Sequence, residues 1–142
     1  MPPTLESPVL ASTKWLLTLC ARRGFLAFTR IHVMPIIRGS GRFSKNVDMA
    51  GFADLEIVVP PHGCVGYIET KSTDGRLSDA QQAFRNSRVA MGARYCVSRS
   101  LDESAAFLVK LGVPVHLVLG GLNSGARRDP SDATRRADPT SA

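Results

Sequence analysis

The sequence predicts an α/β fold in which a central mixed sheet is flanked by helices. Segments with helical and with strand-like hydrophobic spacing alternate along the chain, and glycine or proline marks most of their boundaries. A chain of 142 residues, 44% of them hydrophobic, is large enough to bury the core of one domain. From residue 123 onward apolar residues are almost absent, so we expect a folded domain over residues 1–122 and a disordered tail over residues 123–142.

The N-terminal part begins with an expected helix from Pro8 to Arg23, where apolar residues recur at helical spacing before Gly24. Ser7 is the expected N-cap of this helix. The stretch from Phe25 to Ile37 mixes β-branched and aromatic residues and predicts a strand. The glycine-rich basic segment 38–42 then predicts a flexible loop.

The C-terminal part contains two capping-box spacings, which predict helix starts. One helix is expected from Ser78 to near Gly92, and another from Ser100 to Leu111. Residues 94–100 between them are typical of a strand. The short apolar run from Val115 to Leu119 predicts a last strand.

Two strand-like runs, residues 53–59 and 64–71, flank a proline-rich turn and predict an antiparallel hairpin. The register set by this turn places Asp54 directly opposite Glu69, with their β-carbons ~4.5–5.5 Å apart. Lys71 points to the same face, because side chains alternate along a strand. Two carboxylates at this separation repel unless a cation lies between them, and Mg²⁺, with oxygen ligands at ~2.0–2.1 Å, suits the span. The opposite face presents an apolar set for packing on a core: Leu55, Ile57, Val59 and Ile68.

Four motifs follow one another from residue 51 onward: Gly51-Phe52-Ala53-Asp54, Glu69-Thr70-Lys71, Gly75-Arg76-Leu77-Ser78 and Gln81. Their order resembles that of the VRR-NUC domains, which belong to the PD-(D/E)xK nucleases. The resemblance covers roughly residues 51–108 well and the first helix loosely. It implies a restriction-endonuclease-like sheet and Mg²⁺-dependent hydrolysis of phosphodiester bonds in DNA, with Mn²⁺ as a substitute metal.

The same resemblance implies roles for individual residues. Asp54 and Glu69 would bind the metal together with the Thr70 carbonyl, Lys71 would position or activate the attacking water, and Gln81 would support the site. Two positions depart from the family pattern. Ala53 stands where the family has a proline, and Glu6 matches only loosely the acidic residue expected on the first helix, which leaves Glu6 as a candidate supporting acid.

The net charge of +6 favours a polyanionic partner, and with the nuclease motifs it indicates DNA. The candidate phosphate contacts are basic residues near the expected acid pair and in the glycine-rich loop: Arg30, Arg38, Arg42, Lys45, Arg76 and Arg85. Arginines on a helix surface are more often simply solvated. Asp54, Glu69 and Lys71 have the alternative of an exposed ion cluster, and Gln81 that of a capping-box partner of Ser78.

We therefore expect a structure-selective DNA endonuclease of phage or bacterial replication or repair. Two rivals stay open: a non-catalytic nucleic-acid-binding module, and a subunit of a replication or repair assembly. A homodimer is compatible with the sequence, and no residue requires one.

Location and redox state follow from the cysteines and the N-terminus. Three cysteines, at positions 20, 64 and 96, are widely spaced in apolar stretches and are expected to be reduced, buried thiols. The N-terminal residue order does not fit a secretory signal, and no apolar run approaches the ~18 residues of a membrane helix. We expect a cytoplasmic protein without a membrane partner.

Overall fold

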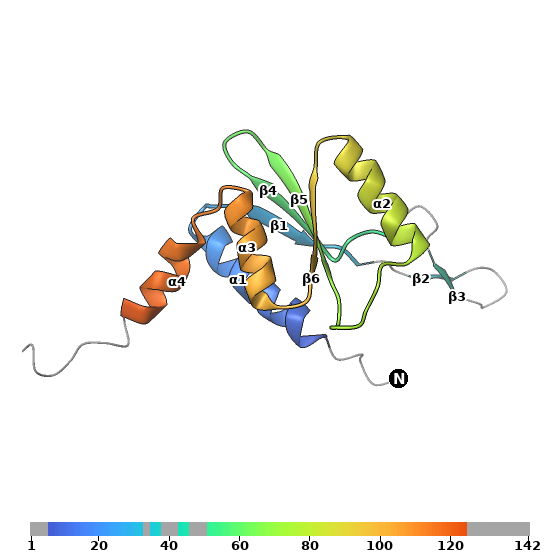
Figure 1. The fold of residues 1–142 in the computed structure, drawn as a ribbon, viewed down its shortest axis with the longest axis horizontal. Coiled ribbons are helices and arrows are strands. Elements are labelled where there is room, and N and C mark those ends of the chain that lie inside the picture. The colour runs from blue at the N-terminus through green and yellow to red at the C-terminus, as the bar shows by residue number, and fades with distance from the viewer. Residues whose placement is uncertain (1–5, 33–34, 38–42, 46–50, 125–142) are drawn as a thin grey trace, which may run out of the picture.

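The structure, a computed structural model, describes residues 6–32, 35–37, 43–45 and 51–124, which form four helices and six strands (Figure 1). The helices and strands predicted over residues 53–111 are confirmed, and their ends differ from the prediction by two residues or fewer. In chain order the elements are α1 (Pro8–Arg22), β1 (Ala27–Arg30), β2 (Pro35–Ile37), β3 (Phe43–Lys45), β4 (Leu55–Val59), β5 (Cys64–Thr70), α2 (Asp79–Ala90), β6 (Arg94–Ser98), α3 (Leu101–Lys110) and α4 (Val115–Ser124).

Four of the strands form a mixed sheet in the order β1-β4-β5-β6. Strand β4 is antiparallel to both β1 and β5, whereas β6 is parallel to β5, and α2 supplies the crossover that a parallel pair requires. Strands β2 and β3 pair with each other in a separate two-stranded sheet. Helices α1, α3 and α4 lie on one side of the four-stranded sheet and α2 on the other (Figure 1). The predicted α/β class, a mixed sheet flanked by helices, is confirmed.

The β4–β5 hairpin has the predicted register. Leu55 pairs with Ile68 and Glu56 with Tyr67, so the next position along the ladder brings Asp54 opposite Glu69. The alternation of side chains follows from this register. Leu55, Ile57, Val59 and Ile68 are all buried on one face, as predicted.

The larger of two hydrophobic cores lies between this face and helices α1, α3 and α4. It is built from leucine, isoleucine, valine, phenylalanine and cysteine side chains that recur at helical spacing in the helices. Ser7 caps α1 as predicted, accepting a hydrogen bond from the Leu10 backbone N–H at 3.2 Å. A buried chain of hydroxyls crosses the same region: Ser104 Oγ lies 2.8 Å from Thr13 Oγ1 and 2.6 Å from Ser98 Oγ. These bonds join α1, α3 and β6 and satisfy polar groups that would otherwise be buried without partners.

The smaller core lies on the other face of the sheet, under α2. It contains the buried residues Ala53, Tyr67 and Phe84, with the Phe84 ring edge-on to Tyr67 at 5.1 Å between centroids. A capping box at Ser78 starts α2, and Phe84 is its buried residue. This helix therefore covers its face of the sheet with few apolar side chains and leaves room for polar ones.

Three predictions about secondary structure are corrected. Val115 to Leu119 belongs to helix α4 and is not a strand, because Val115 and Val118, three residues apart, both turn into the larger core. The strand predicted from Phe25 to Ile37 is divided into β1 and β2, which pair in different sheets. Residues 123 and 124, predicted to start the disordered tail, form the end of α4, and the rest of the tail lies outside the described residues.

The prediction of three buried thiols is correct for Cys20 only. Cys64 is exposed beside the hairpin turn, and Cys96 is half-buried. All three are free thiols.

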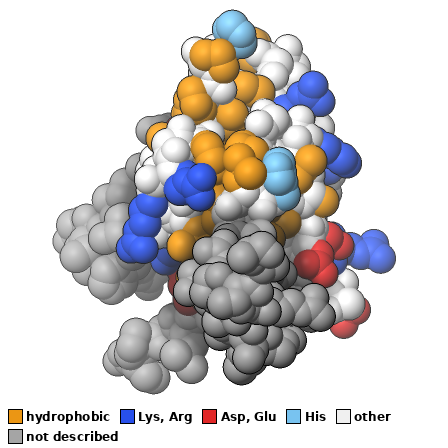
Figure 2. Space-filling view, turned by 90° about the vertical axis from the view of Figure 1, so that its left-hand side faces the viewer, with side chains coloured by type: hydrophobic (Ala, Val, Ile, Leu, Met, Phe, Trp, Pro, Cys, Tyr) orange, Lys and Arg blue, Asp and Glu red, His pale blue; other side chains and the backbone are white. Residues whose placement is uncertain are grey.

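Seen from the α4 end, the surface shows hydrophobic side chains between separate basic ones (Figure 2). Apolar side chains with large exposed fractions include Val109 of α3 at 58% and Leu117 of α4 at 48%. Among the described residues, no helix combines the length and the apolar character that crossing a bilayer demands.

Candidate active site

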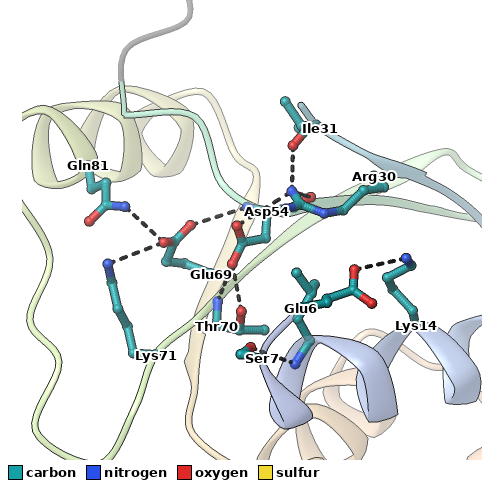
Figure 3. Close-up of polar contacts among 11 residues, drawn as sticks. Glu6, Ser7, Lys14, Arg30, Ile31, Asp54, Glu69, Thr70, Lys71 and Gln81 are labelled. Carbon is teal, nitrogen blue, oxygen red and sulfur yellow. Dashed lines mark hydrogen bonds and ion pairs between the residues drawn. The ribbon is translucent and has the colours of Figure 1, made fainter. Parts of the chain in front are cut away.

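Asp54 and Glu69 meet at the open end of the β4–β5 hairpin (Figure 3). The Asp54 backbone N–H donates to Glu69 Oε2 at 3.1 Å. Asp54 Oδ2 in turn accepts two hydrogen bonds from Thr70, one from the backbone N–H at 2.8 Å and one from the hydroxyl at 2.7 Å. The two acids are thus held beside each other by backbone groups of the hairpin itself.

The Glu69 carboxylate is buried, with 5% of its side chain exposed, and is bonded by two long polar side chains. Gln81 Nε2 donates to Glu69 Oε1 at 2.8 Å, and Lys71 Nζ lies 3.4 Å from the same oxygen. The burial of Glu69 excludes a fully solvated ion cluster. Lys71, Gln81 and the two acids therefore form one connected group (Figure 3).

Gln81 makes a capping contact and a contact with Glu69. Its Oε1 accepts from the Ser78 backbone N–H at 2.9 Å, which completes the capping box of α2, while its amide nitrogen bonds Glu69. Gly51 lies against the N-terminus of α2, and its φ of +78° and close backbone contact require glycine. A β-carbon at Gly51 would lie 2.2 Å from the Ala80 carbonyl oxygen.

The electrostatics of the pair favour a bound cation. Burial, followed by the negative charge of Asp54, raises the pKa of Glu69 to about 7, against the opposing effect of the Lys71 ammonium. Two acids in this position therefore do not readily carry two negative charges at once. A divalent cation would remove that conflict.

The donor atoms fit a hydrated Mg²⁺. Within the part of the chain that the structure describes, no three His, Cys, Asp or Glu side chains converge on one point. Mg²⁺ does not need three, because it keeps several waters and binds through one or two carboxylates. Asp54, Glu69 and the Thr70 carbonyl offer oxygen atoms only, which suits Mg²⁺ or Mn²⁺ better than zinc.

Arg30 lies at this site and not on the open surface. Its Nη1 donates to the Asp54 carbonyl oxygen at 3.0 Å and to the Ile31 carbonyl oxygen, and lies 3.5 Å from Asp54 Oδ1. The sequence placed Arg30 among the phosphate contacts, because no local pattern reveals which acid it meets. The bond from the Thr70 hydroxyl to Asp54 was not predicted either, because alternation along β5 assigns Thr70 to the face opposite Glu69.

The remaining sequence candidates are not brought to the acid pair by any contact of the described residues. Glu6 pairs with Lys14 at 2.9 Å, and both side chains are more than a third exposed. Arg76 is exposed and Arg85 is half-buried, with its Nε bonded to Asn86 Oδ1 at 3.3 Å. Arg38 and Arg42 lie outside the described residues, and so does the side chain of Lys45.

A buried hydroxyl that the sequence did not indicate lies near the acids. Tyr95 Oη, on β6, is buried without a hydrogen-bond partner in the described structure. Burial, and after it the charge of Glu69, raises the pKa of Tyr95 well above its usual range. Its strand position opposite Tyr67 gives it the same face as the acids.

The fold resembles a solved VRR_NUC domain. The similarity covers 70% of this chain and 95% of the matched chain, with 16% sequence identity and a TM-score of 0.44. At this level the match describes the arrangement of helices and strands alone. No protein-family model and no curated protein matches the sequence.

Proposed function

We propose that this protein is a Mg²⁺-dependent deoxyribonuclease that hydrolyses phosphodiester bonds at the Asp54–Glu69 pair. The observation that carries the proposal is the connected group at the hairpin end: two adjacent carboxylates, one of them buried, with Lys71 Nζ 3.4 Å from Glu69 Oε1. Two acids that can hold a cation, with a lysine beside them on one face, suit metal-dependent phosphodiester cleavage. The order of motifs along the sequence, which resembles that of VRR-NUC domains, supports the same chemistry.

The chain's own residues divide the work. Asp54, Glu69 and the Thr70 carbonyl would hold the cation, which when bound supplies an acidified water and a positive charge beside the scissile phosphate. Lys71 places a second positive charge next to Glu69, where it holds a water or offsets charge on the phosphate. Gln81 fixes the Glu69 carboxylate from the α2 side.

Binding of DNA would rest on the basic surface. The net charge of +6 supports attraction to a polyanion. The proposed phosphate contacts are Arg38, Arg42 and Lys45 of the basic segment 38–45, Arg76 before α2 and Arg85 within α2. We further propose that the substrate is branched DNA of a phage or bacterial replication or repair process.

The test is incubation of the protein with Mg²⁺ and a panel of linear, nicked, flapped and four-way DNAs, each labelled at one end. Cleavage that stops when a chelator removes the metal supports the proposal, and preference within the panel defines the substrate. Binding to these DNAs without any cleavage would instead identify a non-catalytic DNA-binding module. Stable co-purification with other proteins, again without cleavage, would favour a subunit of a larger assembly.

A further inference from the structure

Arg30 is the last residue of β1, and its guanidinium turns toward Asp54 (Figure 3). The Arg30 side chain is 23% exposed, close to the 22% of Asp54. Its contacts are the carbonyl oxygens of Ile31 and Asp54 and the carboxylate of Asp54. Two of the three partners are backbone groups, so the guanidinium is held in a fixed place.

Two of the three guanidinium nitrogens of Arg30 are not available to an anionic ligand, because Nη1 bonds two carbonyl oxygens and Nε is buried. Arg30 Nε is buried and has no partner among the described residues, so it lies where solvent does not reach. A phosphate that bonded two guanidinium nitrogens at once would have to reach the buried Nε, or draw Nη1 away from the two carbonyls. Both routes are costly, because a buried polar group that loses its partner costs about 1–3 kcal/mol.

Asp54 lies just before the first residue of β4, at the position where regular strand pairing ends. Its carbonyl oxygen accepts from the Ile31 N–H at 2.9 Å as well as from Arg30. Its carboxylate is held from two sides, by Thr70 on Oδ2 and by Arg30 near Oδ1. Without Arg30, one side of the carboxylate and part of its backbone support would be lost.

We propose that Arg30 is a positioning residue that holds Asp54 in place for cation binding and does not touch DNA. The inference deepens the proposed function and rests on it. Residues that support a metal ligand in this way typically change metal affinity by about 10–100-fold when they are replaced.

Charge and positioning predict opposite results for removal of Arg30, and this makes the proposal testable. A guanidinium 3.5 Å from Asp54 Oδ1 repels a cation bound to the same carboxylate. If charge were its main effect, removing Arg30 would tighten metal binding. If Arg30 positions Asp54, removing it weakens metal binding although a positive charge has gone.

The experiment measures binding of Mn²⁺ alone, without DNA, by electron paramagnetic resonance of the free ion. We expect Arg30→Ala to bind Mn²⁺ about tenfold more weakly than the unaltered protein. Arg30→Lys should also bind weakly, because it restores the charge but not the planar donor group that spans two carbonyls. The control is Arg94→Ala, which removes an exposed arginine at the start of β6 and should leave the affinity unchanged.

Unchanged or tighter Mn²⁺ binding by Arg30→Ala overturns the proposal. Circular dichroism and the melting temperature show whether each variant is folded. If Arg30→Ala does not fold, Arg30→Gln carries the same test, since it removes the charge and keeps an amide donor for one carbonyl.

A second measurement separates positioning from DNA contact. In the presence of a chelator, the slope of log affinity against log salt should be the same for Arg30→Ala and the unaltered protein. Loss of a phosphate contact would reduce the slope by ~0.9 for duplex DNA, and that result would overturn the proposal.

The two proposals fail in different ways. If the unaltered protein neither binds Mn²⁺ nor cleaves DNA, the proposed function fails and the role of Arg30 fails with it. If the unaltered protein does both, and Arg30→Ala keeps full Mn²⁺ affinity, only the role of Arg30 fails.

Discussion

The two faces of the central sheet differ in what they bury. The face under α1, α3 and α4 is covered by a large and mostly apolar core, whereas the face under α2 has a cluster of three buried hydrophobic residues and a group of charged side chains at its end. Ile68 and Glu69 show the contrast best, because they are neighbours in β5 and are both buried, at 0% and 4% exposure, on opposite faces.

Stability is therefore expected to depend mainly on the face under α1, α3 and α4, and the proposed chemistry on the face under α2. A large apolar core supplies the free energy of folding, because each fully buried aliphatic side chain contributes about 1.5–3 kcal/mol. This free energy offsets the repulsion between the two acids on the α2 face. A small domain without such a core could not easily offset that repulsion. Substitutions in the large core should therefore change the free energy of unfolding, whereas substitutions at the acid pair should change the cleavage rate.

The largest expected effect is on catalysis, from Glu69→Gln. The variant loses an anionic ligand but little volume, so Mg²⁺-dependent cleavage should be abolished while the melting temperature changes little. Glu56→Gln is the matched control, since it makes the same change on the same face, at the position opposite Tyr67, where no described contact joins it to Asp54 or Glu69. Full activity in Glu69→Gln would refute the proposed site. Loss of activity in Glu56→Gln would mean that Glu56 also belongs to the site.

The next effect is on stability, from Ile68→Ala. Removing a fully buried side chain from the large core should lower the free energy of unfolding by about 2–5 kcal/mol. Urea denaturation measures the change, with Val109→Ala at an exposed position as the control for a similar loss of methyl groups. A loss below about 1 kcal/mol, typical of a surface site, would contradict the assignment of stability to this face.

Lys71→Ala should lower the cleavage rate by about 100-fold and change DNA affinity far less. One lysine among many basic residues adds little to binding, whereas in the proposed function Nζ, which lies beside Glu69, would act on the reacting phosphate. Single-turnover kinetics and fluorescence anisotropy separate the two quantities. Equal losses in rate and affinity would assign Lys71 to DNA binding.

The smallest effect concerns the thiols and compares the large core with the hairpin turn. Cys20 belongs to the large core and Cys96 packs against it, and burial raises the pKa of both thiols, that of Cys96 to about 11. Cys64 is exposed at the turn. A thiol reagent at pH 8 should therefore modify Cys64 rapidly and the other two only after denaturation. Mass spectrometry identifies the sites, and rapid modification of Cys20 would mean that the large core opens readily.

The hairpin and its acids were predictable because their determinants are local. The turn residues set the register, and alternation along β4 and β5 then assigns each side chain to a face. Ser78 and Gln81 were predictable for the same reason, since a capping box spans four residues.

Features that depend on distant parts of the chain were not predictable. The partner of Arg30 follows from the pairing of β1 with β4, which brings together residues 24 positions apart. Val115 to Leu119 is a short apolar run that fits a strand or a helix, and packing against the large core decides between them. The break between β1 and β2 likewise reflects pairing in two different sheets, which the composition of residues 25–37 does not reveal.

The double use of Gln81 has a consequence for local opening of the chain. The same side chain closes the first turn of α2 and bonds Glu69, so fraying of that turn releases both at once. Helix ends open more readily than helix centres, and amide hydrogen exchange records such opening. The protection of the Ser78 and Gln81 amides therefore reports how much of the time Glu69 is held in its place, in a protein that has neither metal nor DNA bound.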